Sequence, residues 1–201
     1  MNKLKLTIIF LSIFFSSNLH ALIEVDITRG NLNPLPIAVS PIHSDNETTS
    51  LLKKEIGIDD IGYEISNIIE NNLKATGLFN PLEKKAFLQK PDVAHLKPRF
   101  EDWSLIKAQA LITGKVEFND EKVRVEFRLW DVLAAKEMMA LAFTTVPNNW
   151  RRVGHIISDK VYERLTGEKG YFDTRIIYVS EEGPKTQRIK KLAIMDQDGA
   201  N

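Results

Sequence analysis

His155, Ser158 and Asp159 are the side-chain types of a hydrolase triad, and they occur close together in the sequence. The surrounding segment has helical periodicity, so positions three and four apart share one helix face. One helix face supplies neither the strained turn that exposes a nucleophile nor an oxyanion hole, and the sequence contains no G-x-S-x-G pattern. We therefore expect no catalytic residue here and interpret His155 as a structural histidine with satisfied hydrogen-bonding groups.

Two short motifs resemble the beginnings of ligand-binding loops. Residues 196–199, Asp-Gln-Asp-Gly, start like an EF-hand calcium loop, but the third acidic position and the closing glutamate do not follow. A hairpin turn is the simpler interpretation. Residues 167–170, Gly-Glu-Lys-Gly, lack the spacing of a P-loop. Since the chain also contains no cysteine, the sequence predicts no metal ligand and no cofactor.

The remaining candidates have structural explanations. Asp59 and Asp60 precede a helical pattern, where a carboxylate caps the helix and complements its dipole. Trp103 and Trp150 each stand where a helix is expected to begin, and we interpret them as core anchors.

The composition is that of a folded globular protein, with 43% hydrophobic and 27% charged residues. Lysine plus arginine and aspartate plus glutamate each total 27, giving a formal net charge of +0. The chain therefore lacks the positive charge typical of proteins that bind nucleic acid or an anionic membrane.

The first residues predict export from the cytoplasm. Lys3 and Lys5 precede an apolar run over residues 6–15, which has the length of a signal-peptide core and is too short to span a bilayer. We predict a cleavable signal peptide over residues 1–21, with Ala21 at the cleavage site, and no membrane insertion of the mature protein. An uncleaved anchor is the alternative.

An alternating segment follows the predicted cleavage site. Ile23, Val25 and Ile27 alternate with Glu24, Asp26 and Thr28, which predicts a strand with one apolar face. Such a terminal strand can pair with the sheet edge of a partner, or it can be the first strand of its own sheet. The candidate partner-binding residues are Leu22, Ile23, Glu24, Val25, Asp26, Ile27 and Thr28.

The mature chain then alternates between strands and helices. Strands are predicted at residues 34–40, 79–82, 110–118, 123–129 and 138–146, and helices at 60–76, 102–106 and 150–165; residues 41–59 and 84–98 are predicted to be loops. Gly77 and Gly167 follow the two long helices as stop signals. The predicted fold is α/β, with one mixed sheet covered by two long helices.

The pattern changes after residue 170. Strands are predicted at residues 175–179 and 188–195, and two strands alone form only a marginal hairpin. We interpret residues 170–201 as the start of a second, all-β domain whose remainder lies outside this sequence.

Several motifs resemble the TolB family of the Tol-Pal system. They are D-I-G at 60–62, G-L-F-N-P-L at 77–82, Trp150 with the following Gly154-His155, S-D-K-V-Y-E-R-L-T-G-E-K-G at 158–170, T-R-I-I-Y-V at 174–179 and L-A-I-M-D-Q-D-G at 192–199. The resemblance implies an α/β amino-terminal domain over residues 22–169, followed by a six-bladed β-propeller that begins at residues 170–201.

The resemblance also implies a function. It points to a non-enzymatic periplasmic adaptor that links an inner-membrane TolA-like protein to a Pal-like lipoprotein, maintaining outer-membrane integrity and supporting invagination at cell division. TolA would bind residues 22 to about 33, and Pal would bind the propeller. The alternative is an exported propeller-containing hydrolase of the prolyl-oligopeptidase type, whose catalytic domain lies outside this chain.

Overall fold

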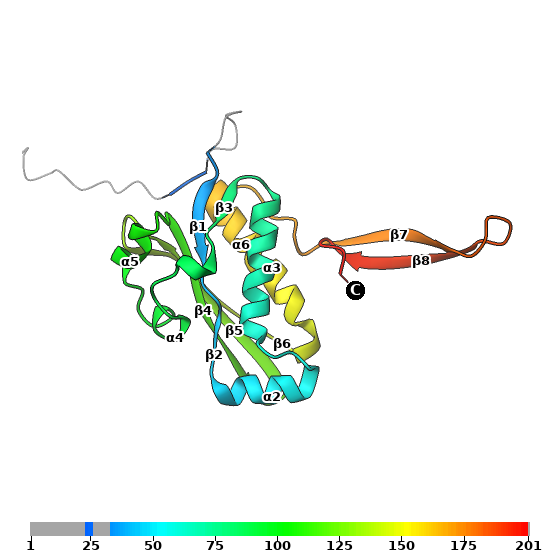
Figure 1. Ribbon diagram of the computed structural model, residues 1–201, viewed down its shortest axis with the longest axis horizontal. Coiled ribbons are helices and arrows are strands. Elements are labelled where there is room, and N and C mark those ends of the chain that lie inside the picture. The colour runs from blue at the N-terminus through cyan, green and yellow to red at the C-terminus, as the bar shows by residue number, and fades with distance from the viewer. Residues whose placement is uncertain (1–22, 26–32, 201) are drawn as a thin grey trace, which may run out of the picture.

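The chain forms a mixed α/β body with a projecting hairpin (Figure 1). The computed structural model describes residues 23–25 and 33–200. Its strands are β1 (Leu35–Val39), β2 (His43–Ser44), β3 (Phe79–Pro81), β4 (Ala110–Asn119), β5 (Lys122–Asp131), β6 (Lys136–Thr145), β7 (Arg175–Glu182) and β8 (Ile189–Asp196). Its α-helices are α2 (Asn46–Ile56), α3 (Ile61–Ala75), α4 (Pro91–Ala94), α5 (Phe100–Leu105) and α6 (Trp150–Thr166), with 3₁₀ turns at Lys84–Ala86 and Pro147–Asn149.

The main sheet has the strand order β3-β1-β4-β5-β6, and β2 pairs with β4 beside this path. β1 runs parallel to β3 and β4, whereas β4, β5 and β6 are antiparallel neighbours. β4 and β5 are joined by the tight turn at Asp120 and Glu121, whose positive φ angles of 51° and 59° match a hairpin turn with two left-handed residues. The predicted mixed sheet with two long helices is confirmed.

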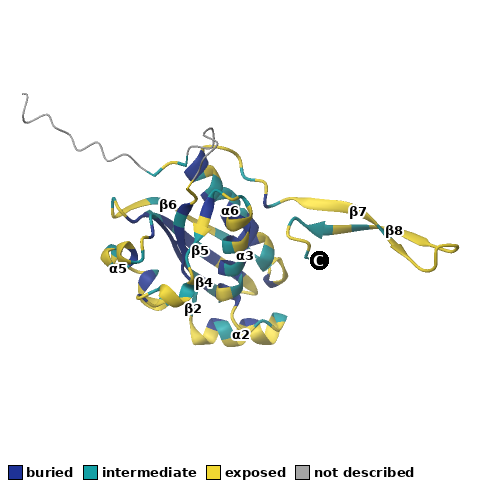
Figure 2. Cartoon of the chain, turned by 45° about the horizontal axis from the view of Figure 1, so that its top comes forward, coloured by how far each residue is buried: buried dark blue, intermediate teal, exposed yellow. Residues whose placement is uncertain are grey.

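α3 and α6 pack together over the sheet, because each presents an apolar stripe at helical spacing. The stripes, which are buried in the core shown in Figure 2, consist of Ile61, Ile65, Ile69 and Leu73 on α3 and Val153, Ile157, Val161 and Leu165 on α6. Asp60 caps α3 by accepting a hydrogen bond from the Tyr63 amide at 2.9 Å. Gly167 ends α6 in the left-handed region at φ 76°.

The other face of the sheet carries a smaller apolar cluster. Trp103 of α5 is buried there with Leu111 and Val132. Its indole nitrogen donates to Gln89 Oε1 at 3.1 Å, so the prediction of Trp103 as a core anchor is confirmed. Trp150 is half-buried against the main core.

The prediction that residues 41–59 form only a loop is wrong. They contain β2 and the helix α2, which Asp45 caps by accepting from the Thr48 amide at 2.7 Å and which ends at Gly57 with φ 73°. Only Thr48 and Leu52 of α2 are buried. Its apolar stripe is therefore too narrow to stand out from the polar sequence. Residues 84–98, also predicted to be a loop, contain a 3₁₀ turn and the four-residue helix α4.

β7 and β8 form a two-stranded hairpin that projects from the body (Figure 1). Large apolar side chains on it are exposed, including Ile177 at 65% and Leu192 at 77%. A turn closed by a hydrogen bond from the Gly199 amide to the Asp196 carbonyl follows β8, as predicted. Among the helices of the described residues, none combines the length and apolar composition that crossing a membrane requires.

Candidate partner-binding segment

Ile23–Val25 lie against the α/β body beside the last turn of α6. The Val25 amide donates to the Leu165 carbonyl at 2.7 Å, and the Ile23 amide donates to Asp131 Oδ2 at 3.3 Å. Ile23 and Val25 pack on the main core, whereas Glu24 is exposed. The alternation expected from the sequence is therefore present in these three residues.

The predicted strand is wrong for Ile23–Val25, because these three residues pair with no strand in the described part of the chain. Their amide groups use a helix-end carbonyl and a side-chain carboxylate as acceptors. The carbonyls of the last helical turn have no partner within their own helix, and Leu165 offers one of these to Val25. The other candidate residues, Leu22, Asp26, Ile27 and Thr28, lie outside the described residues, as does the predicted signal peptide.

The Asp131 carboxylate accepts hydrogen bonds both from the turn between β5 and β6 and from the segment Ile23–Val25. It is 1% exposed at the end of β5. Its Oδ1 accepts from the Ala134 amide at 2.9 Å in the turn to β6, and its Oδ2 accepts from Ile23. Sequence reasoning missed this residue. The available signal was its position in β5, where it continues the buried alternation of Val125, Phe127 and Leu129 with a charged side chain.

A groove of about 570 Å³ runs beside the docked residues. It is lined by Ile23, Glu24, Met139, Lys160, Glu163, Arg164 and Gly167. Arg164 Nε donates to the Met138 carbonyl on β6 at 3.4 Å, and Lys160 pairs with Glu163 at 2.9 Å. The segment thus lies between the end of α6 and the edge strand of the sheet.

None of the hydrogen bonds of the three hydrolase-type residues joins one of them to another; His155 and Ser158 both contact Asn72. Ser158 Oγ donates to the Gly154 carbonyl at 2.8 Å. The Asp159 carboxylate accepts the amides of Phe172 and Asp173 at 2.6 and 3.1 Å, which holds the start of the link to β7. His155 is one helical turn before Asp159, and its side chain points toward Asn72 of α3, with Nδ1 2.9 Å from Asn72 Nδ2.

His155 is only partly satisfied. Its Nε2 is buried and has no hydrogen-bond partner among the described residues, although Asp198 Oδ2 lies 3.7 Å away. The expectation of a fully satisfied histidine is therefore wrong at this atom. Burial lowers the pKa of His155, while the carboxylates of Asp198 and Asp196 act in the opposite direction.

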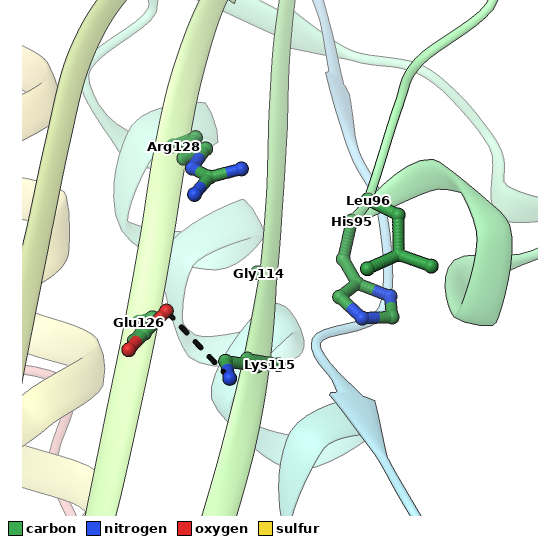
Figure 3. A pocket seen from close by; sticks show the side chains of 6 residues that line it. All are labelled: His95, Leu96, Gly114, Lys115, Glu126 and Arg128. Atoms are coloured by element: carbon green, nitrogen blue, oxygen red, sulfur yellow. Dashed lines mark ion pairs between the residues drawn. The ribbon is translucent and has the colours of Figure 1, made fainter.

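His43 and His95, far apart in sequence, stack with ring centroids 4.6 Å apart. His95 also lines a pocket of about 170 Å³ beside β4 and β5, together with Leu96, Gly114, Lys115, Glu126 and Arg128 (Figure 3). Lys115 lies 2.6 Å from Glu117 and 4.0 Å from Glu126, and Arg128 lies 3.5 Å from Glu137. The positive side chains of this pocket are thus already paired with carboxylates.

Comparison with known proteins decides the family. Residues 23–138 match the model of the family described as the TolB amino-terminal domain, which is more than half of the chain. The chain belongs to the TolB amino-terminal domain family. The match includes the docked segment and the sheet as far as the start of β6; α6 and the β7–β8 hairpin follow it.

Individual TolB proteins agree with this assignment. The chain is 80% identical over 181 residues to the Tol-Pal system protein TolB of Pelagibacter ubique (strain HTCC1062), covering 90% of this chain and 41% of the relative. It is similar in fold to the crystal structure of TolB from Acinetobacter baumannii, with a TM-score of 0.64 and 24% identity, covering 84% of this chain and 37% of that one. The chain thus spans about two fifths of the length of the curated relative.

Proposed function

We propose that this chain is the amino-terminal part of a non-enzymatic periplasmic adaptor of the Tol-Pal system. In this role it links a TolA-like inner-membrane protein to a Pal-like lipoprotein, maintaining outer-membrane integrity and supporting invagination at division. Membership of the TolB family and 80% identity to a Tol-Pal system protein support the proposal. They favour the adaptor over the hydrolase alternative.

The observation that carries the partner-binding role is the way Ile23–Val25 are held. Two backbone amides, those of Ile23 and Val25, make the hydrogen bonds, and no strand of the described sheet pairs with the segment. These N–H groups can instead donate to the backbone carbonyls at the edge of a partner's sheet, because such pairing uses the main chain and does not depend on the side-chain types. Residues 22–28 are therefore proposed as the TolA-type binding site.

Residues 170–201 are proposed as the start of the propeller that a Pal-like lipoprotein binds. The exposed apolar side chains of β7 and β8 support this, because an isolated hairpin with such a surface needs further strands to cover it. Residues 1–21 are proposed as the signal peptide that delivers the chain to the periplasm.

Calorimetry tests the proposal with the C-terminal domain of a TolA-like protein from the same source. Deletion of residues 22–33 should weaken binding at least about tenfold, because the proposed donors and apolar side chains are lost. Ile23→Asp with Val25→Asp should have a similar effect, since both alter the apolar positions. Leu141→Asp, at an exposed apolar position on β6, is the matched control for added charge. Unchanged affinity after the deletion contradicts the site assignment.

A further inference from the structure

A cluster of metal-ligand types lies where α6 meets the turn after β8. His155, Asp196 and Asp198 each direct one ligand atom into it, and these atoms lie within 4.8 Å of one another. His155 Nε2 is 3.7 Å from Asp198 Oδ2. The two carboxylates come from the Asp-Gln-Asp-Gly turn and the imidazole from a helix that precedes it by some forty residues, so the sequence alone did not bring them together.

The imidazole of His155 provides the independent observation. The residue is 2% exposed, yet its Nε2 has no hydrogen-bond partner among the described residues. Asn72 lies against the other ring nitrogen at 2.9 Å, which fixes the ring so that Nε2 faces the carboxylates. A buried polar nitrogen without a partner is rare in proteins, because its desolvation is then uncompensated. This atom is therefore oriented toward a ligand position.

A small cavity adjoins the cluster. It has a volume of about 50 Å³ and lies between α6 and the base of the hairpin, where its lining includes His155 and Asp196 together with the cations Arg151, Arg152 and Arg175. In a tetrahedral site, nitrogen and oxygen ligands about 2.0–2.2 Å from Zn²⁺ are about 3.3–3.6 Å from one another. The 3.7 Å separation of His155 and Asp198 is close to this value, and the three ligand atoms as a set lie within 4.8 Å of one another, so the carboxylates have to move inward when an ion binds.

We propose that His155 Nε2, Asp196 and Asp198 form a binding site for a divalent transition-metal ion of the zinc type. One imidazole and two carboxylates suit such an ion, and the fourth position is left for solvent. The ion joins α6 of the α/β body to the turn after β8, so its binding energy holds the hairpin against the body. This inference does not depend on the proposed Tol-Pal role.

Arg151 is the cation that competes with the metal. Its guanidinium lies 2.5 Å from Asp198 Oδ2 and 3.8 Å from Asp196 Oδ2, and Arg175 lies 3.8 Å from Asp196 Oδ1. The side chain of Arg151 is 25% exposed, so it can turn toward solvent when a divalent ion takes its place. Removing this guanidinium should therefore tighten metal binding. If the cluster were only an ion pair between Arg151 and the aspartates, no metal would bind with or without Arg151.

Asn72 can hydrogen-bond to Nδ1 of His155 whether or not that nitrogen carries a proton. A metal on Nε2 requires the proton on Nδ1, and Asn72 then has to present its amide oxygen to that N–H. Turning the amide over achieves this when the Ser158 hydroxyl, 3.0 Å from Asn72, rotates to donate to the amide oxygen instead of to the Gly154 carbonyl. The same residue thus positions the imidazole with and without metal.

Calorimetry and thermal unfolding of the full chain with ZnCl₂ test the proposal. We expect saturable binding of one ion and a rise in the melting temperature. Asp198→Asn, on the partly exposed turn, and His155→Asn should each weaken binding at least about tenfold, because losing even a residue that only supports a metal ligand has an effect of this size. Arg151→Met should strengthen binding. His43→Ala is the control, because it disrupts the other histidine pair.

Two sets of outcomes overturn the proposal. One is the lack of saturable Zn²⁺ binding by the wild-type chain, or equal affinity in the wild type and Asp198→Asn. The other is binding that is lost in His43→Ala and retained in His155→Asn, which would place the ion at the stacked histidines. Since Asp198→Asn changes a residue of the exposed turn after β8, the test does not depend on whether His155→Asn folds.

Discussion

The amide of Val25 donates a hydrogen bond to the carbonyl of Leu165 at 2.7 Å, joining the start of the described chain to the end of α6. Gly167 ends the helix by donating to Glu163, so Val25 satisfies a carbonyl that the helix itself leaves without a partner. Ile23 has an analogous bond to Asp131. The proposed partner-binding segment is therefore held by acceptors that belong to the fold.

Asp131→Asn should release Ile23 while retaining the turn to β6. An asparagine oxygen can still accept from the Ala134 amide, but the NH₂ group then faces the Ile23 amide, donor against donor. We expect faster hydrogen exchange at Ile23 and Val25 and a loss of about 1–3 kcal/mol in the free energy of unfolding. Hydrogen exchange read by NMR measures the first effect. Asp92→Asn, in the exposed helix α4, is the control; equal exchange rates in the two variants would refute the anchoring role.

Asp60 and its neighbour Asp59 should differ in their importance for stability. Asp60→Ala removes the side chain that caps α3 and should cost about 0.5–2 kcal/mol. Asp59→Ala removes an ion pair to Lys53 between two exposed side chains, which is worth little in water. Urea unfolding of the two variants compares them directly. A larger loss for Asp59→Ala would contradict the assignment of the cap.

Two glycines should tolerate a methyl group to different degrees. A Cβ on Gly62 would lie 1.9 Å from the Ile42 carbonyl oxygen, whereas one on Gly154 would lie 2.9 Å from Ile68 Cγ2. The Ile68 side chain can adopt another rotamer, but the Ile42 carbonyl can move only if the backbone between β1 and β2 moves with it. We expect Gly154→Ala to cost about 1–3 kcal/mol, the range for overpacking, and Gly62→Ala to cost more. Denaturation with urea gives both values; the reverse order would show that the α3–α6 contact is the tighter one.

Acid should destabilise the fold through His43. Burial lowers the pKa of His43, the neighbouring His95 lowers it further, and Asp92, Asp45 and Asp60 act in the opposite direction. Since the pKa is lower in the folded state than its usual 6.5, the unfolded state binds the proton more readily. This contribution to stability is complete above pH 6.5 and is lost as the pH falls from there toward the folded-state pKa.

His43→Asn removes that proton-binding difference. Between pH 7.5 and 5, its free energy of unfolding should fall less steeply than that of the wild type, by at most about 1.4 kcal/mol per pH unit for one proton. Urea unfolding at several pH values supplies the slopes. Identical slopes in the two proteins would show that His43 does not titrate differently on folding.

Local patterns predicted most of the fold. α3 and α6 have wide apolar stripes and a capping aspartate or a terminal glycine, so each could be recognised within its own segment. Burial alternates along the whole of β5 but only along the second half of β4, whose first five residues are all buried. α2 was missed because only Thr48 and Leu52 are buried. A narrow stripe gives little periodic signal.

The candidate site depended on contacts that local patterns do not contain. Asp131 lies 108 residues from Ile23 in sequence, and Leu165 contributes a backbone carbonyl that its side-chain type does not reveal. The alternation of Ile23, Glu24 and Val25 correctly predicted which side chains face the core. It could not indicate that the acceptors would be a helix end and a carboxylate rather than a neighbouring strand.

NMR of the Val25 amide during titration with the C-terminal domain of a TolA-like protein tests whether residues 22–28 bind this partner. If residues 22–28 bind the partner, the Val25 amide exchanges the Leu165 carbonyl for an acceptor on the partner. Its NMR signal should therefore shift as the partner saturates, and its protection from hydrogen exchange should then depend on the bound partner. Glu163, whose carbonyl bonds Gly167, should stay unchanged as an internal reference for α6. Saturation of the partner with the Val25 signal and its protection unaltered would contradict the proposed function of this segment.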